Sequence, residues 1–405
     1  MRLSDIRSRL EAVPGFSEAL TATENGLPCD LQARNAAKPI FLAALADRLD
    51  RPLILIVPDE ARASEMVQDI QAWVATADVM SLPDPDQPAY SQMAVNQNIL
   101  NQRVGVLSRL ANPQPRKGKS RQLVVVASIP ALLRRLVPPE EFRRQFLTLK
   151  PGVEVSPEDL ARRLAGLGYR RNPLVESHGQ FAGRGGIVDF FPPDGDLPVR
   201  IDFFGDEIES LRYFDPESQL SGDACPEIIL SSASEVPVWM GRDVAGALRS
   251  LDLAGLRPED RETWVRHLDN LENNIYFDSA AFYTMSTMTD AVTLLDYSPD
   301  ALVVIDEFDG VRWAIAESDR AAAEHRQRQV AAGEIPADIG SPVFAAEDLT
   351  TALARAQLRI SHADHPVAFG RDATRIVIES FGQTTSYAGR LAVLLTDLEE
   401  ARAAR

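Results

Sequence analysis

The chain has 405 residues, and 59 acidic against 42 basic side chains give it a formal net charge of −17. This length predicts more than one domain, and the hydrophobic fraction of 45% is ordinary for a globular protein. The acidic balance argues against non-specific nucleic-acid binding by the whole surface, because a duplex repels a negative body. Two cysteines, Cys29 and Cys225, are too few for a disulfide framework or a four-cysteine zinc site. Since no apolar stretch is long enough to span a bilayer and no signal segment is visible, we expect a cytoplasmic protein.

The first 144 residues have the alternating pattern of an α/β domain. Continuous apolar runs, which predict buried parallel strands, occur at 53–57, 79–82 and 123–127. Helical patterns follow two of these runs, near 61–73 and 130–136. Strands that alternate with helices indicate a parallel sheet covered on both faces.

The pattern changes near residue 145. Ser156 followed by Pro157 and two acids predicts the start of a helix that stops at Gly168. Residues 174–214 then alternate short apolar segments with glycines and a Pro-Pro-Asp-Gly turn, which indicates antiparallel strands. The sequence therefore predicts a smaller α+β domain inserted at 145–236.

The α/β domain is expected to resume over 237–370, because the apolar run 301–305 again has the form of a buried strand. Residues 371–405 are expected to begin a further domain or to form a linker helix. A helical pattern around 386–405 places four leucines on one face: Leu391, Leu394, Leu395 and Leu398. No glycine or proline stops it after Gly389, which favours a chain cut from a longer protein over a native end that frays.

Two segments have the form of a nucleotide-hydrolysing site. A phosphate loop, G-x-x-x-x-G-K-[ST], uses backbone amides and a lysine to hold phosphates and a hydroxyl to bind Mg²⁺. Residues 32–39 (QARNAAKP) stand in the expected place but keep only Lys38. Gln32 and Ala37 replace the two glycines, and Pro39 has no hydroxyl.

The other half of that site is Asp306-Glu307, at the end of the apolar run 301–305. Motor ATPases use such strand-ending acids to hold Mg²⁺ and polarise water, although the pair can also simply end a strand. With the loop degenerate, we expect no ATP hydrolysis and no catalytic residue in this chain. The five histidines are scattered without further ligands at metal spacing, so neither a metal nor another cofactor is expected in this segment: His178, His267, His325, His362 and His365.

A predicted β-hairpin carries the remaining signal. Its two arms are residues 183–192 and 199–208, which flank an Asp194-Gly195 turn. Strand alternation directs three residues of the second arm to the core (Val199, Ile201 and Phe203) and three to the opposite face (Arg200, Asp202 and Phe204). If Phe191 pairs with Val199, Gly186 lies opposite Phe204, and Arg184 joins the second face diagonal to Phe204.

Two arginines and an aromatic on a solvent-facing sheet have the composition of a protein-binding hot spot. The alternative is that Phe204 packs under a loop and the arginines pair with acids such as Asp206 or Glu207. Spacing alone does not exclude either interpretation.

The same residues carry a family resemblance. The run 184–221, RGGIVDFFPPDGDLPVRIDFFGDEIESLRYFDPESQLS, resembles the domain-2 signature shared by the excision-repair protein UvrB and the transcription-repair coupling factors. Further matching segments are PLILIVPDEARASEMVQDI, QPAYSQMAVNQNILNQRVGVLSRL, LVVVASIPALLRRLVPP and LLDYSPDALVVIDEFDGV. Two departures from UvrB favour the coupling factors: the degenerate phosphate loop, and a segment 83–103 that is too short and too poor in tyrosine for UvrB's damage-binding hairpin.

The resemblance implies a degenerate, RecA-type helicase-like domain whose inserted domain docks UvrA. The family's docking residues match Arg184, Arg200 and Phe204 here. It also implies that the chain recruits UvrA to lesions where RNA polymerase has stalled. ATP and Mg²⁺, and most contacts to RNA polymerase and DNA, would belong to translocase and polymerase-binding domains outside these 405 residues; no membrane is involved. Two alternatives are a UvrB-type damage verifier with ATPase activity and a stand-alone UvrA-binding adaptor.

Overall fold

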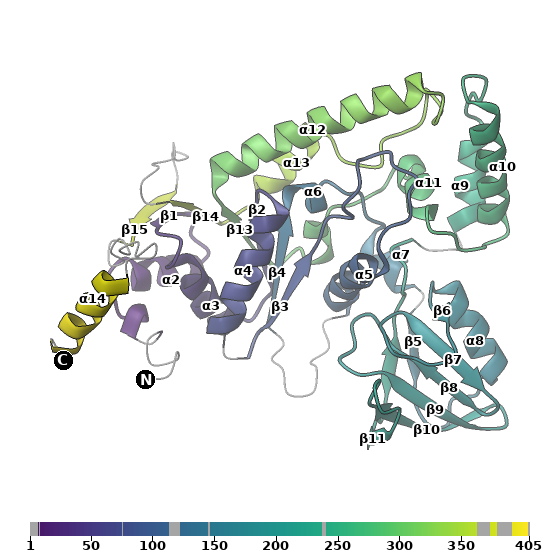
Figure 1. Cartoon of the computed structure of the whole chain (residues 1–405), viewed down its shortest axis with the longest axis horizontal. Coiled ribbons are helices and arrows are strands. Elements are labelled where there is room, and N and C mark those ends of the chain that lie inside the picture. Colours follow the sequence, from purple (N-terminus) through teal and green to yellow (C-terminus); the bar gives the residue numbers. More distant parts are fainter. Residues whose placement is uncertain are drawn as a thin grey trace.

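The structure is a computed structural model that describes residues 7, 9–74, 76–112, 122–144, 146–236, 240–362, 373–378 and 391–403. Three units stand out in Figure 1: an α/β body, an inserted domain with its own sheet, and a small helical unit above that domain. None of the described helices is long and apolar enough to cross a membrane.

The body is built on a seven-stranded sheet with the order β15-β1-β14-β13-β2-β4-β3. Every pairing in this sheet is parallel. The strands are β1 (Cys29–Ala33), β2 (Leu53–Val57), β3 (Asp78–Leu82), β4 (Leu123–Ser128), β13 (Leu302–Asp306), β14 (Leu358–His362) and β15 (Thr374–Val377). The apolar runs predicted as strands form β2, β3, β4 and β13, which confirms the parallel α/β fold class.

Helices cover both faces of this sheet, so its strands are apolar on both sides. Leu53, Leu55 and Val57 pack against one set of helices, and Ile54 and Ile56 pack against the other. The first set is α2 (Phe16–Glu24), α3 (Lys38–Arg48) and α4 (Glu60–Trp73). The second set is α5 (Gln97–Ala111), α6 (Ile129–Leu132), α7 (Pro139–Arg143), α12 (Phe308–Ala331) and α13 (Ala346–Leu353).

The inserted domain has a six-stranded sheet with the order β11-β10-β9-β8-β7-β6, antiparallel except for the short β6–β7 pair. Its strands are β6 (Arg170–Arg171), β7 (Gln180–Arg184), β8 (Ile187–Phe190), β9 (Val199–Phe204), β10 (Glu207–Phe214) and β11 (Ser221–Ala224). Helix α8 (Pro157–Gly166) packs Leu160 and Leu164 against one face. Strands β5 (Leu147–Leu149) and β12 (Ile228–Leu230) pair where the chain enters and leaves this domain.

The helical unit consists of α9 (Gly241–Leu248), α10 (Pro258–Glu272) and α11 (Ala280–Thr287) around Trp264 and Tyr283. A 3₁₀ turn, η2 (Leu294–Tyr297), then leads back to the body, and α14 (Leu391–Ala403) ends the described chain. Figure 1 shows α12 crossing the top of the body toward the helical unit.

Two features of the body differ from the sequence-based expectation. Strand β1 was not predicted, because Asp30 and Gln32 interrupt its apolar pattern although both are buried. Strand β15 lies beyond residue 370, where a further domain was expected to begin, yet it pairs with β1 as part of the large sheet. The expected helix around 386–405 is observed as α14, and its first residues lie outside the described part of the chain, as does His365.

Candidate functional site

The residues of the degenerate nucleotide site lie together at the carboxyl ends of β1 and β13. Lys38 is the first residue of α3 and has no exposed surface. Its Nζ donates to Asp306 Oδ1 at 2.8 Å and also to the carboxylate of Glu307. The structure therefore brings the lysine of the degenerate loop and both strand-ending acids into direct contact.

Arg62 is a further member of this cluster that the sequence analysis missed. Its Nε donates to the second oxygen of Asp306 at 2.8 Å, so the buried carboxylate lies between two cations. Burial lowers the pKa of Arg62, but the attraction of Asp306 and Glu65 outweighs this effect and raises it. The sequence could have indicated Arg62 by its position in the first turn of α4, the helix that follows β2. Because parallel strands end at a common edge of the sheet, this turn lies near the end of β13.

Glu307 reaches Lys38 through an unusual backbone. It is in the left-handed region, at φ 55° and ψ 64°, directly before α12. A non-glycine residue there costs on the order of 1 kcal/mol, so surrounding contacts must hold it. Its amide donates to the carbonyl of Ile360 at 2.8 Å, and its carboxylate contacts Lys38.

This arrangement is a closed ion cluster. A phosphate loop needs an outward-facing lysine and positive-φ turns that aim amide groups at a ligand. In residues 32–39 no backbone φ is positive, and Ala37 and Lys38 are fully buried. Arg375 donates to the Gln32 side chain at 3.0 Å, so the residue at the position of the first loop glycine makes a half-buried polar contact.

The predicted hairpin of the inserted domain is observed with a different register. Phe190, not Phe191, pairs with Val199, and the expected first arm breaks at Gly185-Gly186 into β7 and β8. Gly185 has φ +57°, as a two-residue turn between antiparallel strands requires. The two errors cancel for Arg184: it pairs with Ile187, which pairs with Asp202, so it still lies on the face of Arg200 and Phe204.

We call this face, opposite α8, the outer face of the inserted domain. Phe204 lies at its rim and is 79% exposed, which excludes the alternative that it packs under a loop. It ends β9 and pairs with Glu207 across a two-residue turn in which Gly205 has φ +63°. Arg184 is exposed at the same end of the sheet, with β8 between it and β9, and donates to the carbonyl of Pro173.

Arg200 is not an exposed side chain, contrary to the expectation of one open patch. Its guanidinium makes two parallel bonds to Asp189, from Nε at 2.8 Å and from Nη2 at 2.9 Å. It also lies 4.7 Å from the centre of the Phe214 ring, and 20% of the side chain is exposed. The hydrogen bond to Asp189 is the main reason that the pKa of Arg200 is raised. The alternative that the arginines pair with acids is thus observed for Arg200, but the acid is Asp189, which the predicted register had placed out of reach.

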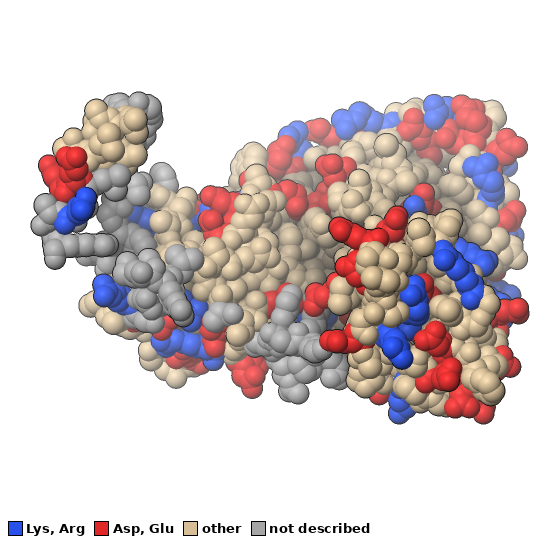
Figure 2. Space-filling view, turned by 60° about the horizontal axis from the view of Figure 1, so that its bottom comes forward, with Lys and Arg blue, Asp and Glu red and all other residues tan. Residues whose placement is uncertain are grey.

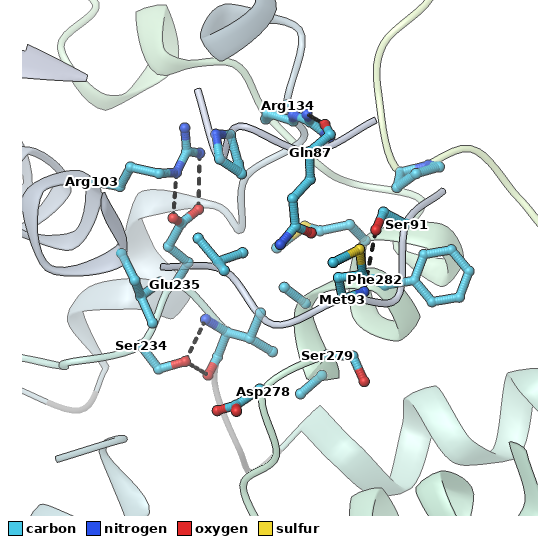
Figure 3. A pocket seen from close by; sticks show the side chains of 18 of the residues that line it. Gln87, Ser91, Met93, Arg103, Arg134, Ser234, Glu235, Asp278, Ser279 and Phe282 are labelled. Carbon is cyan, nitrogen blue, oxygen red and sulfur yellow. Dashed lines mark hydrogen bonds and ion pairs between the residues drawn. The ribbon is translucent and has the colours of Figure 1, made fainter. Parts of the chain in front are cut away.

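A cavity of about 100 Å³ lies where the body, the inserted domain and the helical unit meet. Figure 3 shows Arg103 and Glu235 facing each other on one side of it and Met93 and Phe282 on the other. Arg103, from α5, is almost fully buried, and its Nη2 donates to Glu235 at 3.0 Å. Glu235 follows β12, so this ion pair ties the exit of the inserted domain to the body.

Other groups that could have carried chemistry do not form a site in the described part of the chain. There, no three histidine, cysteine or acidic side chains are placed to hold a metal ion. Cys29 and Cys225 are both buried and free, and burial with nearby Asp30 raises the pKa of Cys29 to about 12. On the face shown in Figure 2, basic and acidic side chains are interspersed among the described residues.

Comparisons with known proteins find matches for the inserted domain and for most of the chain. Residues 147–235 match the family profile of the UvrB interaction domain. The transcription-repair-coupling factor of Bacillus subtilis is 26% identical over 352 residues, which cover 83% of this chain and 29% of that protein. The chain is similar to transcription-repair-coupling factors over most of its length.

Other coupling factors are more similar over a shorter stretch. The protein of Myxococcus xanthus is 34% identical over 209 residues, and that of Escherichia coli is 33% identical over 202 residues. Each match covers 50% of this chain and 17% of the relative. The chain therefore spans less than a third of the length of these coupling factors, and we call its inserted domain the UvrB interaction domain from here on.

Proposed function

We propose that this chain is the UvrA-recruiting module of a transcription-repair coupling factor. In this proposal the outer face of the UvrB interaction domain docks UvrA and brings it to lesions where RNA polymerase has stalled. RNA polymerase and DNA are contacted mainly by other parts of the longer protein. The single observation that supports it most is Phe204, a large aromatic with 79% of its surface exposed at the rim of the sheet.

Such a side chain is costly to leave in water and is typical of an interface anchor. The flanking Arg184 supplies a cation on the same face, and tight turns at Gly185 and Gly205 fix the backbone beside both residues. The face is therefore preorganised, which reduces the ordering cost of association.

The body takes no part in nucleotide chemistry in this proposal. Lys38, the only residue kept from the phosphate loop, is buried and bonded to two carboxylates. Binding Mg·ATP would require breaking that cluster and turning the lysine outward. The rival function, a UvrB-type damage verifier with ATPase activity, needs this same lysine free.

The direct experiment is a calorimetric titration of UvrA with the whole chain. We expect saturable one-site binding by the wild type and a loss of roughly 30-fold for Phe204→Ala, about 2 kcal/mol. Thermal unfolding of that variant should match the wild type, because the removed ring is exposed.

The matched control is Trp313→Ala. Trp313 is also an exposed aromatic, at 69%, but it lies on α12 of the body. It should bind UvrA like the wild type. No binding by the wild type, or equal losses for the two variants, would overturn the proposal.

A further inference from the structure

The outer face places two arginines directly opposite each other. Arg200 of β9 pairs with Arg212 of β10 in the antiparallel register, and facing residues point to the same side of a sheet. Like charges in such a pair destabilise a sheet unless other groups compensate. The charge of Arg200 is paired within the domain and that of Arg212 is not, and we infer different roles for the two residues from this difference.

Arg200 is compensated within the domain. Asp189, its other cross-strand neighbour, accepts both bonds of the guanidinium fork, and the Phe214 ring lies beneath it. Its remaining contacts are with the carbonyl of Gln219 and the hydroxyl of Ser221, each at 3.2 Å. A partner could reach only the exposed fifth of this side chain.

Arg212 has no such partner among the residues that the structure describes. Its side chain is exposed, and among the residues that the structure describes no carboxylate lies within ion-pair distance of it. Asp202, which lies on the same face opposite Ser210, accepts a hydrogen bond from the Ser210 hydroxyl at 2.9 Å. Because Asp189 neutralises Arg200, Arg212 is the member of this facing pair whose charge has no carboxylate partner among the described residues.

Arg212 also borders a hollow of about 510 Å³ on the outer face. The lining residues are Gly186, Ile187, Asp202, Phe203, Glu209, Ser210 and Arg212. Ile187 is a 38% exposed aliphatic in the same cross-strand row as Arg184. The hollow therefore lies beside Ile187, the cross-strand neighbour of Arg184, and its mainly polar lining has Arg212 as its one cation.

We propose that Arg212 is a further docking residue, which pairs with a carboxylate on UvrA. Arg200 is a positioning residue that fixes the sheet surface around it. The inference rests on the proposed function, since it names chemistry of the same docking face. Asp202 and Glu209 border the same hollow and repel an acidic group of the partner. Such a group is therefore accepted only at Arg212, which makes the contact specific in position.

The test is UvrA affinity for three substitutions in the whole chain. Arg212→Ala should weaken binding about tenfold and Arg212→Glu about a hundredfold, because reversal adds repulsion to the lost attraction. Arg212→Lys should lose less than Arg212→Ala, since it keeps the charge without the planar fork. All three should melt at the wild-type temperature, because the side chain is exposed and makes no ion pair with any described residue.

The matched control is Arg162→Ala, an exposed arginine on α8 at the opposite face. It should bind UvrA like the wild type. If Arg212→Ala and Arg212→Glu both bind at full strength while Phe204→Ala is impaired, the inference about Arg212 is wrong and the docking face stands. If the wild type does not bind UvrA, the proposed function fails first.

Discussion

The degenerate nucleotide site and the outer face of the UvrB interaction domain are built from the same kinds of side chain but differ in where their charges are satisfied. In the first, Lys38 and Asp306 have no exposed surface and compensate each other within the fold. In the second, Phe204 is 79% exposed, and Arg184 is an exposed cation on the same face. The cluster is closed within the fold, whereas the outer face leaves an aromatic ring and a cation exposed, where a partner can bind them.

Arg200 is the intermediate case. It lies on the outer face, yet its bidentate bond to Asp189 resembles the closed pairing of the body. Whether a charged side chain is already paired within the fold therefore indicates docking better than its position on a face. Substitutions in the two regions should accordingly differ, with losses of stability in one and losses of binding in the other.

The largest expected effect is on the closed cluster. Lys38→Ala leaves Asp306 and Glu307 without their shared cation, and breaking a buried pair from one side costs about 3 kcal/mol. We expect this loss in the free energy of unfolding of the body, measured by urea denaturation. Arg162→Ala, which removes an exposed pair with Asp159, should leave the curve unchanged. A Lys38→Ala curve that matches the wild type would mean that the cluster is not a stabilising element.

A smaller loss of stability is expected in the UvrB interaction domain. Arg200→Ala leaves Asp189, which is 9% exposed, without its two hydrogen bonds, at a cost of about 2 kcal/mol. Adding Asp189→Ala should restore part of the melting temperature, because the unpaired carboxylate is then removed. If Arg200→Ala melts like the wild type and only its UvrA affinity falls, Arg200 is a docking residue and not a positioning residue.

The smallest expected effect is that of adding nucleotide, for which we expect no binding. Calorimetric titration of the chain with Mg·ATP should show no saturable heat in the micromolar range, because the lysine that would meet the phosphates is bonded to Asp306 and Glu307. A clear one-site isotherm would show that the Lys38 cluster opens to bind nucleotide, and would favour the UvrB-type alternative.

The sequence predicted the parts of this molecule that local pattern determines. Strands β2, β4 and β13 follow from continuous apolar runs, and α8 follows from its Ser156 cap, which accepts a bond from the amide of Asp159. The same patterns predicted the inserted domain, and the residues of the degenerate loop were found by their spacing. All of these depend on neighbours along the chain.

What could not be predicted depends on register and burial. A one-residue difference in pairing hid Asp189 as the partner of Arg200, and β1 was missed because Asp30 and Gln32 are polar yet buried. Arg62 joins Asp306 across 244 positions, which no local pattern indicates. The exposure of Phe204 likewise became known only once the loops around the sheet were placed.

The most direct test of the central claim compares UvrA affinity for one substitution in each region. Glu307→Gln alters the closed cluster at its partly exposed acid, and Phe204→Ala alters the outer face. Our account predicts that Glu307→Gln binds UvrA within about twofold of the wild type, while Phe204→Ala loses roughly 30-fold. Equal losses, or a loss confined to Glu307→Gln, would contradict it.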